Sequence, residues 1–553
     1  MIERKEIEKY ALQNAVFHSG KAELGPVMGK ILSVHPELKK NIQALKKEIE
    51  IVLKWVNKLG IEEQRKKLEE IDPSLLKKKT KKQEGLPELE GVEKGVVTRF
   101  APSPTGPLSL GQFLRAVMLS YYYARKYEGK FILRIEDTDP SKIKKEYAEW
   151  IQEDLKKCGI DWDLLVYQSD RMDIYYEHAE KLLKLGRAYV CECPAEDFKK
   201  FKLKSFECPC RSLKIEEHLK RWGKMLRGGY EEGQAAVRLK TSMSNPNPVL
   251  RDPPILRINK QEHPMKGNKY FVWPLYNFSC AIDDHFLGVT HVFRGKEHEH
   301  NTAVQKIIYD IFGWKMPVVI NFGMIRFLEG KIHTRDVKKM IAEGKISGWD
   351  DPRLPTIRAL LRRGFQPEAF KQCAISCGLS KNDILLSWEN LEGYNRKIID
   401  SIANRYMVVI NPVKIQIEGG PKIKNVSEYL HPDFPQRGKR DIPVNKDAIY
   451  ISKEDFEKLK NKEIRLIGLF NIKLDKKSTY TGNKIIKEMQ KIQWVSEPCV
   501  RVKIVKPDCT LNGFGEKSME LLKINDIIQM ERVGFGRVDE KGIGKITIYF
   551  AHK

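Results

Sequence analysis

Two pairs of cysteines stand close together in the chain: Cys191 with Cys193, and Cys208 with Cys210. Four thiolates that meet in space can bind Zn²⁺ in a tetrahedron, and such a metal fixes a small domain that has little core of its own. Zinc-binding pairs usually have two or more residues between their members, whereas one residue separates these. The pattern therefore predicts a structural zinc site, with four reduced structural thiols as the alternative.

A second group of residues could hold phosphates. The stretch 97–112, VTRFAPSPTGPLSLGQ, combines a β-branched start, a loop rich in Pro, Ser, Thr and Gly, and the entry to an unbroken helix-forming segment, 113–127. Loops between a strand and a helix often bind nucleotides, because the helix offers free N–H groups and the positive end of its dipole. A Pro-rich surface turn is the alternative interpretation. We favour a nucleotide-binding loop.

Carboxylates and further cations follow along the chain. The apolar run 130–135 leads into three carboxylates within residues 136–139, and a later loop carries Lys331 and Arg335. Strand, loop and helix alternate over 96–190, which predicts a parallel, doubly wound sheet. In such a sheet the loops after the strands meet at one edge, where ligands bind. An α/β protein with its site at that edge is expected.

Four strings along the chain resemble one enzyme family. They are 99–106 (RFAPSPTG), 133–140 (LRIEDTDP), 276–294 and 348–356 (GWDDPRLPT). Together they resemble the class I glutamyl-tRNA synthetases, and the last string is typical of the glutamyl and glutaminyl branch. The resemblance runs from about residue 95 to the C-terminus, where the β-rich end is similar to the archaeal type. It implies a class I, Rossmann-like catalytic core.

The resemblance also implies a two-step reaction. Glutamate would react with ATP, in the presence of Mg²⁺, to give glutamyl-adenylate, and the acyl group would pass to the 3′-terminal adenosine of tRNA(Glu), with tRNA(Gln) left open as a second acceptor. This chemistry requires cations on the phosphates and accurate positioning. The implied glutamate site has two arginines for the side-chain carboxylate, an acid and a tyrosine for the ammonium group, and a serine for the backbone: Arg99, Arg294, Glu136, Tyr276 and Ser103.

Both nucleotide signatures of the family are altered in this chain. The first, usually similar to His-Ile-Gly-His, reads Ser109-Leu110-Gly111-Gln112, and these residues are expected to contact ATP. The second, usually similar to Lys-Met-Ser-Lys-Ser, reads Lys331-Ile332-His333-Thr334-Arg335. Its expected catalytic cations are Lys331, His333 and Arg335, and Lys331 is also expected on ATP. Serine and glutamine cannot carry the charge of a histidine, so a catalytically inactive tRNA-binding paralogue is one alternative.

Two other enzymes share the catalytic core. A glutaminyl-tRNA synthetase has the same β-rich end, but its second strand normally ends in two Asp and an Asn, and it lacks the paired arginines. A glutamyl-queuosine-forming enzyme lacks an anticodon domain, whereas a long β-rich region follows residue 405 here. Glu136 and Arg294 therefore favour glutamate and a tRNA ligase.

The order of patterns predicts seven parts. Residues 1–76 have helical periodicity, the run KKKTKKQE has none, and short β-branched runs fill the end of the chain. The expected parts are a helical N-terminal extension (1–76), a linker (77–94), the Rossmann catalytic first half (95–189), an inserted acceptor-binding domain with the cysteine cluster (190–268), the catalytic second half with the Lys331 loop (269–345), a helical connector (346–405) and a β-barrel anticodon-binding region (406–553).

The composition agrees with an RNA-binding protein. The formal net charge of +25 favours a polyanionic partner, although a Lys-rich or thermophilic proteome would produce the same bias. The acceptor stem of a tRNA is expected on the basic segment 214–227. Further RNA contacts are expected from cations on the helix after the DPRLP turn and in the β-rich end: Arg358, Arg362, Arg363, Arg437, Lys439 and Arg440.

Features that the sequence lacks indicate the cellular compartment of the protein. No apolar run approaches the roughly 18–20 residues that span a bilayer, and the N-terminus lacks the apolar core of a signal peptide. Ten cysteines in 553 residues suggest a reducing compartment without a disulfide framework. A cytoplasmic monomer without membrane contact is therefore expected. If it charges tRNA(Gln) as well, an amidotransferase would receive that product.

Overall fold

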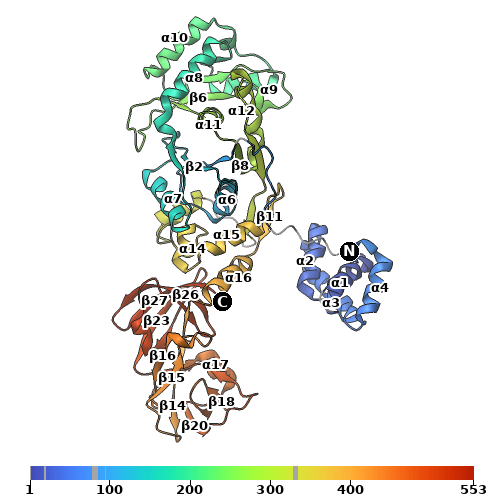
Figure 1. Ribbon diagram of the computed structural model, residues 1–553, viewed down its shortest axis with the longest axis vertical. Coiled ribbons are helices and arrows are strands. Elements are labelled where there is room, and N and C mark those ends of the chain that lie inside the picture. The colour runs from blue at the N-terminus through green and yellow to red at the C-terminus, as the bar shows by residue number, and fades with distance from the viewer. Residues whose placement is uncertain (1, 18–19, 77–84, 94, 328–333) are drawn as a thin grey trace. The chain divides into compact units, whose positions relative to one another are not determined.

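The computed structural model describes residues 2–17, 20–76, 85–93, 95–327 and 334–553 (Figure 1). The chain separates into two compact units, residues 1–87 and 88–553, and each is described by itself. The boundary falls inside the segment expected to be a linker, 77–94. In that segment, however, Glu88 accepts hydrogen bonds from Lys126 and Tyr127, both at 2.6 Å, so its last part is packed on the second unit.

The first unit is a small helical bundle, as the periodicity of residues 1–76 predicts (Figure 1). Apolar residues three and four positions apart form one buried face on each of its long helices, and these faces share one core. Ile7, Ile31 and Ile49 are completely buried there. Its helices are α1 (Arg4–Phe17), α2 (Leu24–Val34), η1 (Pro36–Asn41), α3 (Ile42–Val56), α4 (Ile61–Ile71) and η2 (Pro73–Leu76).

The second unit contains the predicted parallel sheet. Strands β1 (Val97–Phe100), β2 (Lys130–Ile135) and β3 (Leu164–Tyr167) pair in parallel, as do β8 (His291–Gly295) and β9 (Val318–Phe322). The backbone N–H of Thr290 donates to the carbonyl of Val97 at 2.9 Å, so β8 lies beside β1. Helices α6 (Met118–Lys126) and α7 (Lys145–Lys157) share a core with β1 and β2. Strand β3 had not been predicted, because its run LLVY is short and only half-buried.

The segment expected as an unbroken helix, 113–127, is helical but not regular. A short α-helical turn, α5 (Leu110–Gln112), is followed by a π-helical turn, η3 (Phe113–Val117), before α6 begins. A π-turn widens the backbone locally, and such turns frequently mark functional sites. The turn contains Arg115, which is buried and binds three backbone carbonyls from distant segments.

The region around the cysteine cluster has its own sheet. Strands β4 (Ala188–Cys191), β5 (Ala236–Leu239), β6 (Pro254–Ile258) and β7 (Val272–Pro274) form it in that order, all antiparallel. The sequence pattern had assigned β4 to the parallel alternation, but its partner is β5. The outer strands reach slightly beyond the expected range 190–268. The accompanying helices are α8 (Met172–Lys184), α9 (Ala195–Lys204), η5 (Pro209–Ser212) and α10 (Ile215–Leu226).

The chain then returns to the parallel sheet and continues into a mainly helical connector. Helix α11 (Tyr276–Phe286) carries part of the site, and β10 (Ile325–Phe327) pairs in parallel with β11 (Ile384–Leu386). The other α-helices up to the end of the connector are α12 (Glu299–Phe312), α13 (Thr334–Ala342), α14 (Ile357–Arg363), α15 (Pro367–Ser376) and α16 (Trp388–Ile399), and α17 (Lys453–Leu459) follows in the C-terminal region. In the described part of the chain, no helix has the length and apolar character needed to cross a membrane.

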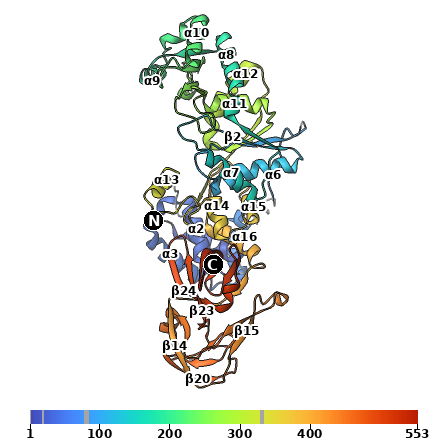
Figure 2. The same ribbon diagram turned by 90° about the vertical axis from the view of Figure 1, so that its left-hand side faces the viewer.

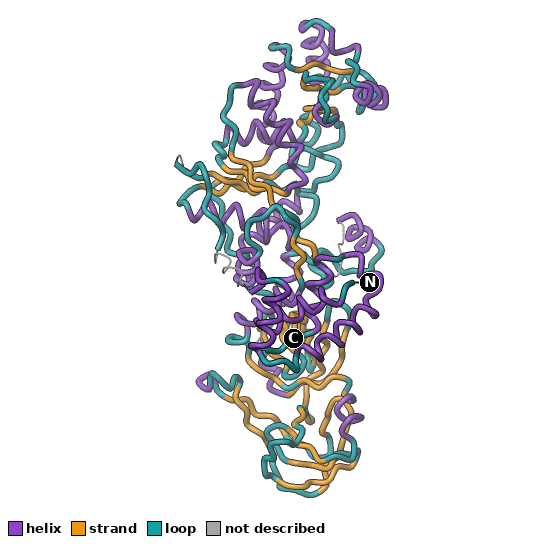
Figure 3. Tube along the Cα trace, turned by 90° about the vertical axis from the view of Figure 1, so that its right-hand side faces the viewer, coloured by secondary structure: helices purple, strands orange, loops and turns teal. Residues whose placement is uncertain are grey.

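The C-terminal region is almost entirely β-structure, as predicted, and forms two barrel-like sheets of seven strands each (Figures 2 and 3). One has the order β12-β25-β26-β27-β23-β24-β13 and the other β21-β18-β19-β20-β14-β17-β22. The first contains β12 (Asn404–Tyr406), β13 (Val408–Ile410), β23 (Cys499–Val505), β24 (Thr510–Glu516), β25 (Ile527–Met530), β26 (Gly534–Gly542) and β27 (Lys545–His552). The second contains β14 (Pro412–Glu418), β17 (Ile449–Ser452), β18 (Glu463–Leu466), β19 (Asn471–Lys473), β20 (Lys477–Gly482), β21 (Lys491–Ile492) and β22 (Val495–Ser496).

Candidate active site

The first two signature strings meet at the ends of β1 and β2. Arg99 lies in β1, and Glu136 comes directly after β2. The backbone N–H of Glu136 donates to the carbonyl of Pro102 at 2.9 Å, which fastens the proline-rich loop to the end of the neighbouring strand. The edge position predicted from the α/β pattern is therefore where the structure places these residues.

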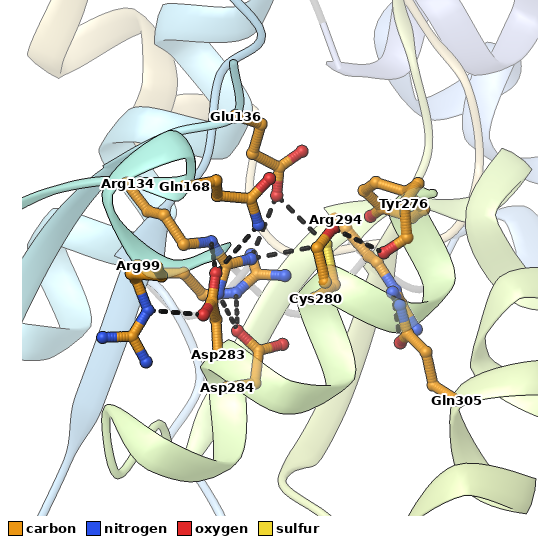
Figure 4. A network of polar contacts seen from close by, with 12 residues as sticks. Arg99, Arg134, Glu136, Gln168, Tyr276, Cys280, Asp283, Asp284, Arg294 and Gln305 are labelled. Carbon is orange, nitrogen blue, oxygen red and sulfur yellow. Dashed lines mark hydrogen bonds and ion pairs between the residues drawn. The ribbon is translucent and has the colours of Figure 1, made fainter. Parts of the chain in front are cut away.

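A buried ion network surrounds Asp284 on helix α11 (Figure 4). Its Oδ1 atom accepts from Nε of Arg99 at 3.1 Å and from Nη1 of Arg134 at 2.6 Å. Burial alone would raise the pKa of Asp284, but the two guanidinium groups hold it below its ordinary value. Within the described residues, the terminal nitrogens of Arg99 have no protein partner. They are therefore free to donate to a ligand, whereas the buried Nε of Arg134 also lacks a hydrogen-bond partner among the described residues.

The carboxylate of Glu136 closes the other end of the network. Its Oε1 atom accepts from Nη2 of Arg134 at 3.0 Å and from the thiol of Cys280 at 3.1 Å. Its side chain is 11% exposed, so it lies at the boundary between the buried ions and solvent. The second carboxylate oxygen makes no hydrogen bond to the described residues and can accept from a ligand.

Tyr276 and Arg294 lie on the adjoining elements. Nη1 of Arg294 donates to Gln305 at 2.9 Å and Nη2 donates to Thr302, while its buried Nε has no partner in the described structure. Burial raises the pKa of the Tyr276 hydroxyl, and the positive charges of Arg99 and Arg294 both act to lower it. The tyrosine therefore lies within electrostatic reach of both arginines. Ser103 is exposed on the first loop.

Sequence reasoning assigned no role to several members of the network. Arg134 is completely buried in β2, and Asp283 accepts from Tyr175 at 2.6 Å, from Arg171 at 2.7 Å and from Gln168 at 2.9 Å. The sequence did offer one signal for this network, namely the arginine within the apolar run KFILRI, because a buried charge in a strand requires a partner. Its partners on α11 are distant in sequence and could not be identified from the pattern.

The first nucleotide signature forms a helix cap. Oγ of Ser109 accepts from the backbone N–H of Gln112, and Oε1 of Gln112 accepts from the backbone N–H of Ser109 at 3.2 Å. In this capping box, the serine side chain and the amide oxygen of the glutamine are already used for hydrogen bonds to the backbone. Leu110 is completely buried, so only its backbone could approach a ligand. A Cβ atom on Gly111 would meet nothing within 4 Å, so open space lies beside this glycine.

The GWDDPRLPT segment supports the first signature from behind. Backbone hydrogen bonds of 2.9 Å join Leu110 to Pro355 and Ile357 to Leu108. The turn itself is held by Asp351, which accepts from Ser347 and from Arg353. Although burial opposes it, these hydrogen bonds lower the pKa of Asp351 to about 2. The structure therefore has a turn at DPRLP, as the sequence indicates, and Asp351 holds it together.

Only part of the second signature belongs to the described structure. Lys331 and His333, predicted as catalytic cations, lie outside the described residues. Arg335 is described, and its side chain is 93% exposed. Thr334 begins α13 next to the first loop, since a Cβ atom on Gly106 would lie 3.5 Å from its methyl group. The described end of this signature thus lies beside the proline-rich loop that leads into the first one.

The four cysteines predicted as zinc ligands meet in space. Their sulfur atoms all lie within 4.8 Å of one another, with 3.8 Å between Cys191 and Cys208 and between Cys193 and Cys210. In a tetrahedral zinc site with Zn–S bonds of about 2.3 Å, neighbouring sulfurs are about 3.8 Å apart. Around them, Arg221 and the backbone N–H of Glu192 donate to the sulfur of Cys210. The donor set and spacing fit Zn²⁺.

Most arginines expected to bind RNA have partners within the protein instead. Arg358 pairs with Glu153 and Asp154, Arg362 with Asp350 and Asp539, and Arg363 is buried against backbone carbonyls of β27. Arg437 binds backbone carbonyls, and Arg440 is buried with Glu516 and Glu531. Charge in a sequence cannot reveal such pairing. RNA contact by these five side chains therefore stays a prediction and would require them to exchange or share their protein partners, while Lys439 is exposed over Tyr429.

Comparison with known proteins supports one family. The model for the catalytic domain of class I (E and Q) tRNA synthetases matches residues 95–401, and the model for their anticodon-binding domain matches 403–492. The curated "Glutamate--tRNA ligase" of Pyrococcus abyssi is 46% identical over 99% of both chains, and that of Thermococcus kodakarensis is 44% identical over 100% of this chain and 99% of its own.

The same name is carried by a relative from Methanocaldococcus jannaschii, which is 42% identical over 99% of this chain and 100% of its own. A solved glutamate tRNA ligase from Elizabethkingia meningosepticum matches 56% of this chain and 70% of its own, at 24% identity and a TM-score of 0.41. The family models together cover most of the chain, and the curated relatives cover all or nearly all of it. This chain belongs to the class I (E and Q) tRNA synthetases.

Proposed function

We propose that the chain activates glutamate with ATP and transfers it to tRNA(Glu), with the buried network around Asp284 as its amino-acid site. That it is a glutamate–tRNA ligase follows from its full-length similarity to curated enzymes of that name. The residue roles rest on the geometry. The observation that supports these roles best is the hydrogen bond from Arg99 to Asp284, which uses only the Nε atom of the guanidinium group.

A fixed guanidinium with two free terminal nitrogens suits a carboxylate, because it can donate two parallel hydrogen bonds to it. Arg294 adds positive charge from β8, next to Tyr276. A glutamine side chain would bring a neutral amide, whose NH₂ group cannot accept from an arginine. We therefore assign selection of glutamate over glutamine to Arg99 and Arg294, and the substrate ammonium group to the free oxygen of Glu136, assisted by Tyr276. Ser103 would contact the substrate backbone.

We place ATP beside Ser109–Gln112. The open space at Gly111 lets a flat adenine ring approach the backbone, and the uncommitted Nε2 group of Gln112 can donate to the nucleotide. Phosphate charge would be met by Lys331, His333 and Arg335, together with Mg²⁺ on the nucleotide oxygens. The acyl-transfer step then requires only that the adenosine of the tRNA reaches the adenylate.

Aminoacylation assays test this proposal. Purified protein should charge a tRNA(Glu) transcript with glutamate and should leave glutamine unreacted. Arg294→Gln should raise the KM for glutamate at least tenfold and reduce the preference for glutamate over glutamine. Arg125→Gln serves as a matched control, because Arg125 is partly exposed and pairs with Asp163 away from the site. Absence of charging and of pyrophosphate exchange in a folded sample would instead support an inactive tRNA-binding paralogue.

The tRNA(Gln) transcript should be assayed separately. Charging of both transcripts would identify a non-discriminating enzyme, and its glutamyl-tRNA(Gln) would require an amidotransferase. We further propose that the enzyme acts as a cytoplasmic monomer, which size-exclusion chromatography with light scattering would check.

We also propose that the cysteine cluster holds a structural Zn²⁺. Cys191 belongs to β4, whereas Cys208 and Cys210 belong to the segment before α10. A bound metal would fasten these segments to each other and steady the inserted region, which would carry the tRNA acceptor stem. The metal supplies cross-linking here, and no reaction step requires it.

A further inference from the structure

The inserted region reaches back to the candidate active site through the loop between β6 and β7, residues 259–271. His263 lies in this loop, and its side chain is completely buried. Nδ1 of the ring accepts from the backbone N–H groups of Met265 at 3.1 Å and of Lys266 at 3.2 Å. The ring proton is therefore on Nε2, which donates to the backbone carbonyl of Asp137 at 2.8 Å. One ring nitrogen thus serves the loop itself, and the other binds the string of carboxylates after β2.

The ring of His263 is held in one orientation. It stacks on the indole of Trp273 in β7, with 4.9 Å between the ring centroids and 11° between the planes. The backbone N–H of His263 donates to the carbonyl of Gly267 at 3.0 Å, and the N–H of Gly267 donates back at 2.8 Å. Gly267 has a φ angle of +57°, which favours glycine and closes this tight turn. The loop therefore presents Nε2–H as a fixed donor.

Asp137 is held from a second side by the end of β3. Its carboxylate accepts from the backbone N–H of Ser169 at 2.8 Å and from the hydroxyl of the same serine at 2.7 Å. Ser169 belongs to η4 (Gln168–Arg171), and Gln168 also binds Asp283 in the ion network. Asp137, which is completely buried, therefore joins the end of β2 to η4 and to the inserted region.

These contacts place Glu136 between two fixed peptide groups. Its own N–H is bonded to Pro102, and the carbonyl of the next residue, Asp137, is bonded to His263. Because peptide groups are planar, the backbone between these two points can vary only in the φ and ψ angles of Glu136 and Asp137. The direction of the Glu136 side chain depends on those angles. A change at His263 would therefore move the carboxylate that we assign to the substrate ammonium group.

Other contacts at the same junction are more exposed. Asp139 accepts from Arg257 at 2.8 Å and from Asn259 at 3.5 Å, and Lys266 pairs with Asp170. Partly exposed ion pairs contribute little, because water and salt screen them. A buried carbonyl that loses its donor is costly by comparison. The hydrogen bond from His263 is thus the contact that fixes the junction most firmly.

We propose that His263 is a positioning residue for Glu136, through which the inserted region holds the ammonium-binding carboxylate in place. The proposal rests on the proposed function, which assigns Glu136 to the ammonium group of glutamate. His263 itself contacts neither substrate, and it acts only through the carbonyl of Asp137.

Two substitutions separate the hydrogen bond from the stacked ring. H263F keeps an aromatic ring against Trp273 but removes Nε2–H, whereas the amide of H263Q offers an N–H donor near the same position. H263F should raise the KM for glutamate at least fivefold and change the KM for ATP less than twofold, because only the ammonium site is displaced. H263Q should bring the KM for glutamate back to within twofold of the unaltered chain.

His218 provides the matched control. It is also buried in the inserted region, but its Nδ1 accepts from the backbone N–H of Val190 on β4, at 3.3 Å. H218F should speed hydrogen exchange in β4 while the peptide 133–140 and the KM for glutamate stay unchanged. H263F should speed exchange in 133–140. The pair of variants distinguishes loss of positioning from general damage to the inserted region.

S169A removes the hydroxyl that holds Asp137 from the other side, so the test does not depend on the folding of H263F alone. S169A should raise the KM for glutamate two- to threefold, again with little effect on the KM for ATP.

A double-mutant cycle tests whether His263 acts through Glu136. In an E136Q background, H263F should lower the kcat/KM for glutamate by less than twofold, because the carboxylate that it positions is already absent. The same fold-loss in both backgrounds would overturn the proposal.

Aminoacylation by the unaltered chain is measured in parallel. Charging by the unaltered chain, with an unchanged KM for glutamate in folded H263F, would refute the positioning role alone. Faster exchange of 133–140 in H263F, without any charging by the unaltered chain, would refute the ligase function alone.

Discussion

The carboxylate of Asp284 accepts from Nε of Arg99 at 3.1 Å, and both side chains are 4% exposed. This contact leaves the two terminal nitrogens of Arg99 without a protein partner in the described structure, and it fixes the plane in which they lie. Asp284 therefore orients the arginine that we assign to the substrate carboxylate, and it also offsets the charge of the neighbouring Arg134.

Asp284→Asn should damage both stability and substrate binding. The substitution leaves two buried guanidinium groups without their shared anion, and breaking a buried ion pair typically costs about 3–5 kcal/mol. We expect a lower melting temperature and a kcat/KM for glutamate at least tenfold lower, mainly through KM, while the KM for ATP changes little. Thermal unfolding and steady-state aminoacylation measure these effects.

Asp310→Asn is the matched control for that variant. Asp310 pairs with Lys306 on the surface, where both side chains are more than 60% exposed, so little change is expected. A wild-type KM for glutamate in a folded Asp284→Asn protein would contradict the orienting role.

Arg115→Gln tests whether the π-helical turn stabilises the fold and positions the first nucleotide signature. Arg115 donates to the carbonyls of Gly323 at 3.2 Å, Gly378 at 2.6 Å and Ser380 at 3.0 Å, so it joins the helix of the first nucleotide signature to the segment after β9 and to the connector. Glutamine is too short to reach all three. Each buried carbonyl that loses its donor costs about 1–3 kcal/mol.

The Arg115→Gln protein should therefore unfold at a lower denaturant concentration and show a higher KM for ATP, with the KM for glutamate less affected. Arg125→Gln, on the exposed side of the same helix, should leave both quantities nearly unchanged. If the two variants show the same unfolding midpoint and the same KM for ATP, Arg115 contributes only its charge.

The signature strings contain much of the site, but not the contacts that organise it. Strand β2 was predicted with its exact bounds, because a β-branched and apolar run ending in carboxylates is distinctive. Arg134 lies inside that strand, yet its partner Asp284 is 150 residues away, and only the folded chain brings the two together. Likewise, Ser109 and Gln112 were read as ligands of ATP, whereas the structure shows that they first bind each other as a helix cap. Local patterns record residue type and spacing, while pairing depends on tertiary structure.

Removal of the metal should loosen the cysteine-bearing region. Purified protein should contain about one zinc per chain, because a four-thiolate site binds a single ion. Cys208→Ser should lose the metal and lower the protection of β4 and β5 in hydrogen exchange, while β1 and β2 keep theirs. Cys509→Ser is the control, since Cys509 is an exposed cysteine far along the chain from the cluster. A metal-free protein with full protection of β4 would favour four reduced structural thiols.

Stability should fall below neutral pH because of His552 at the end of β27. Its Nε2 atom accepts from Asn395 of the connector at 2.9 Å, and its Nδ1–H donates to the carbonyl of Lys553 at 2.9 Å, so the neutral ring is the form that fits. Burial lowers the pKa of His552 to about 4, from an ordinary value of 6.5. Between these two values the unfolded chain binds more protons than the folded one, so the free energy of unfolding rises with pH across this window.

The contribution of His552 to the free energy of unfolding is about 3 kcal/mol, is complete above pH 6.5, and is lost as the pH falls to 4. Denaturant unfolding at several pH values should show this slope, to which other buried histidines with lowered pKa values such as His178 and His218 also contribute, and His552→Gln should reduce the loss of stability across the window by about 3 kcal/mol. His300→Gln, at an exposed histidine, should keep the full slope, and an unchanged slope in His552→Gln would assign the acid sensitivity to another group.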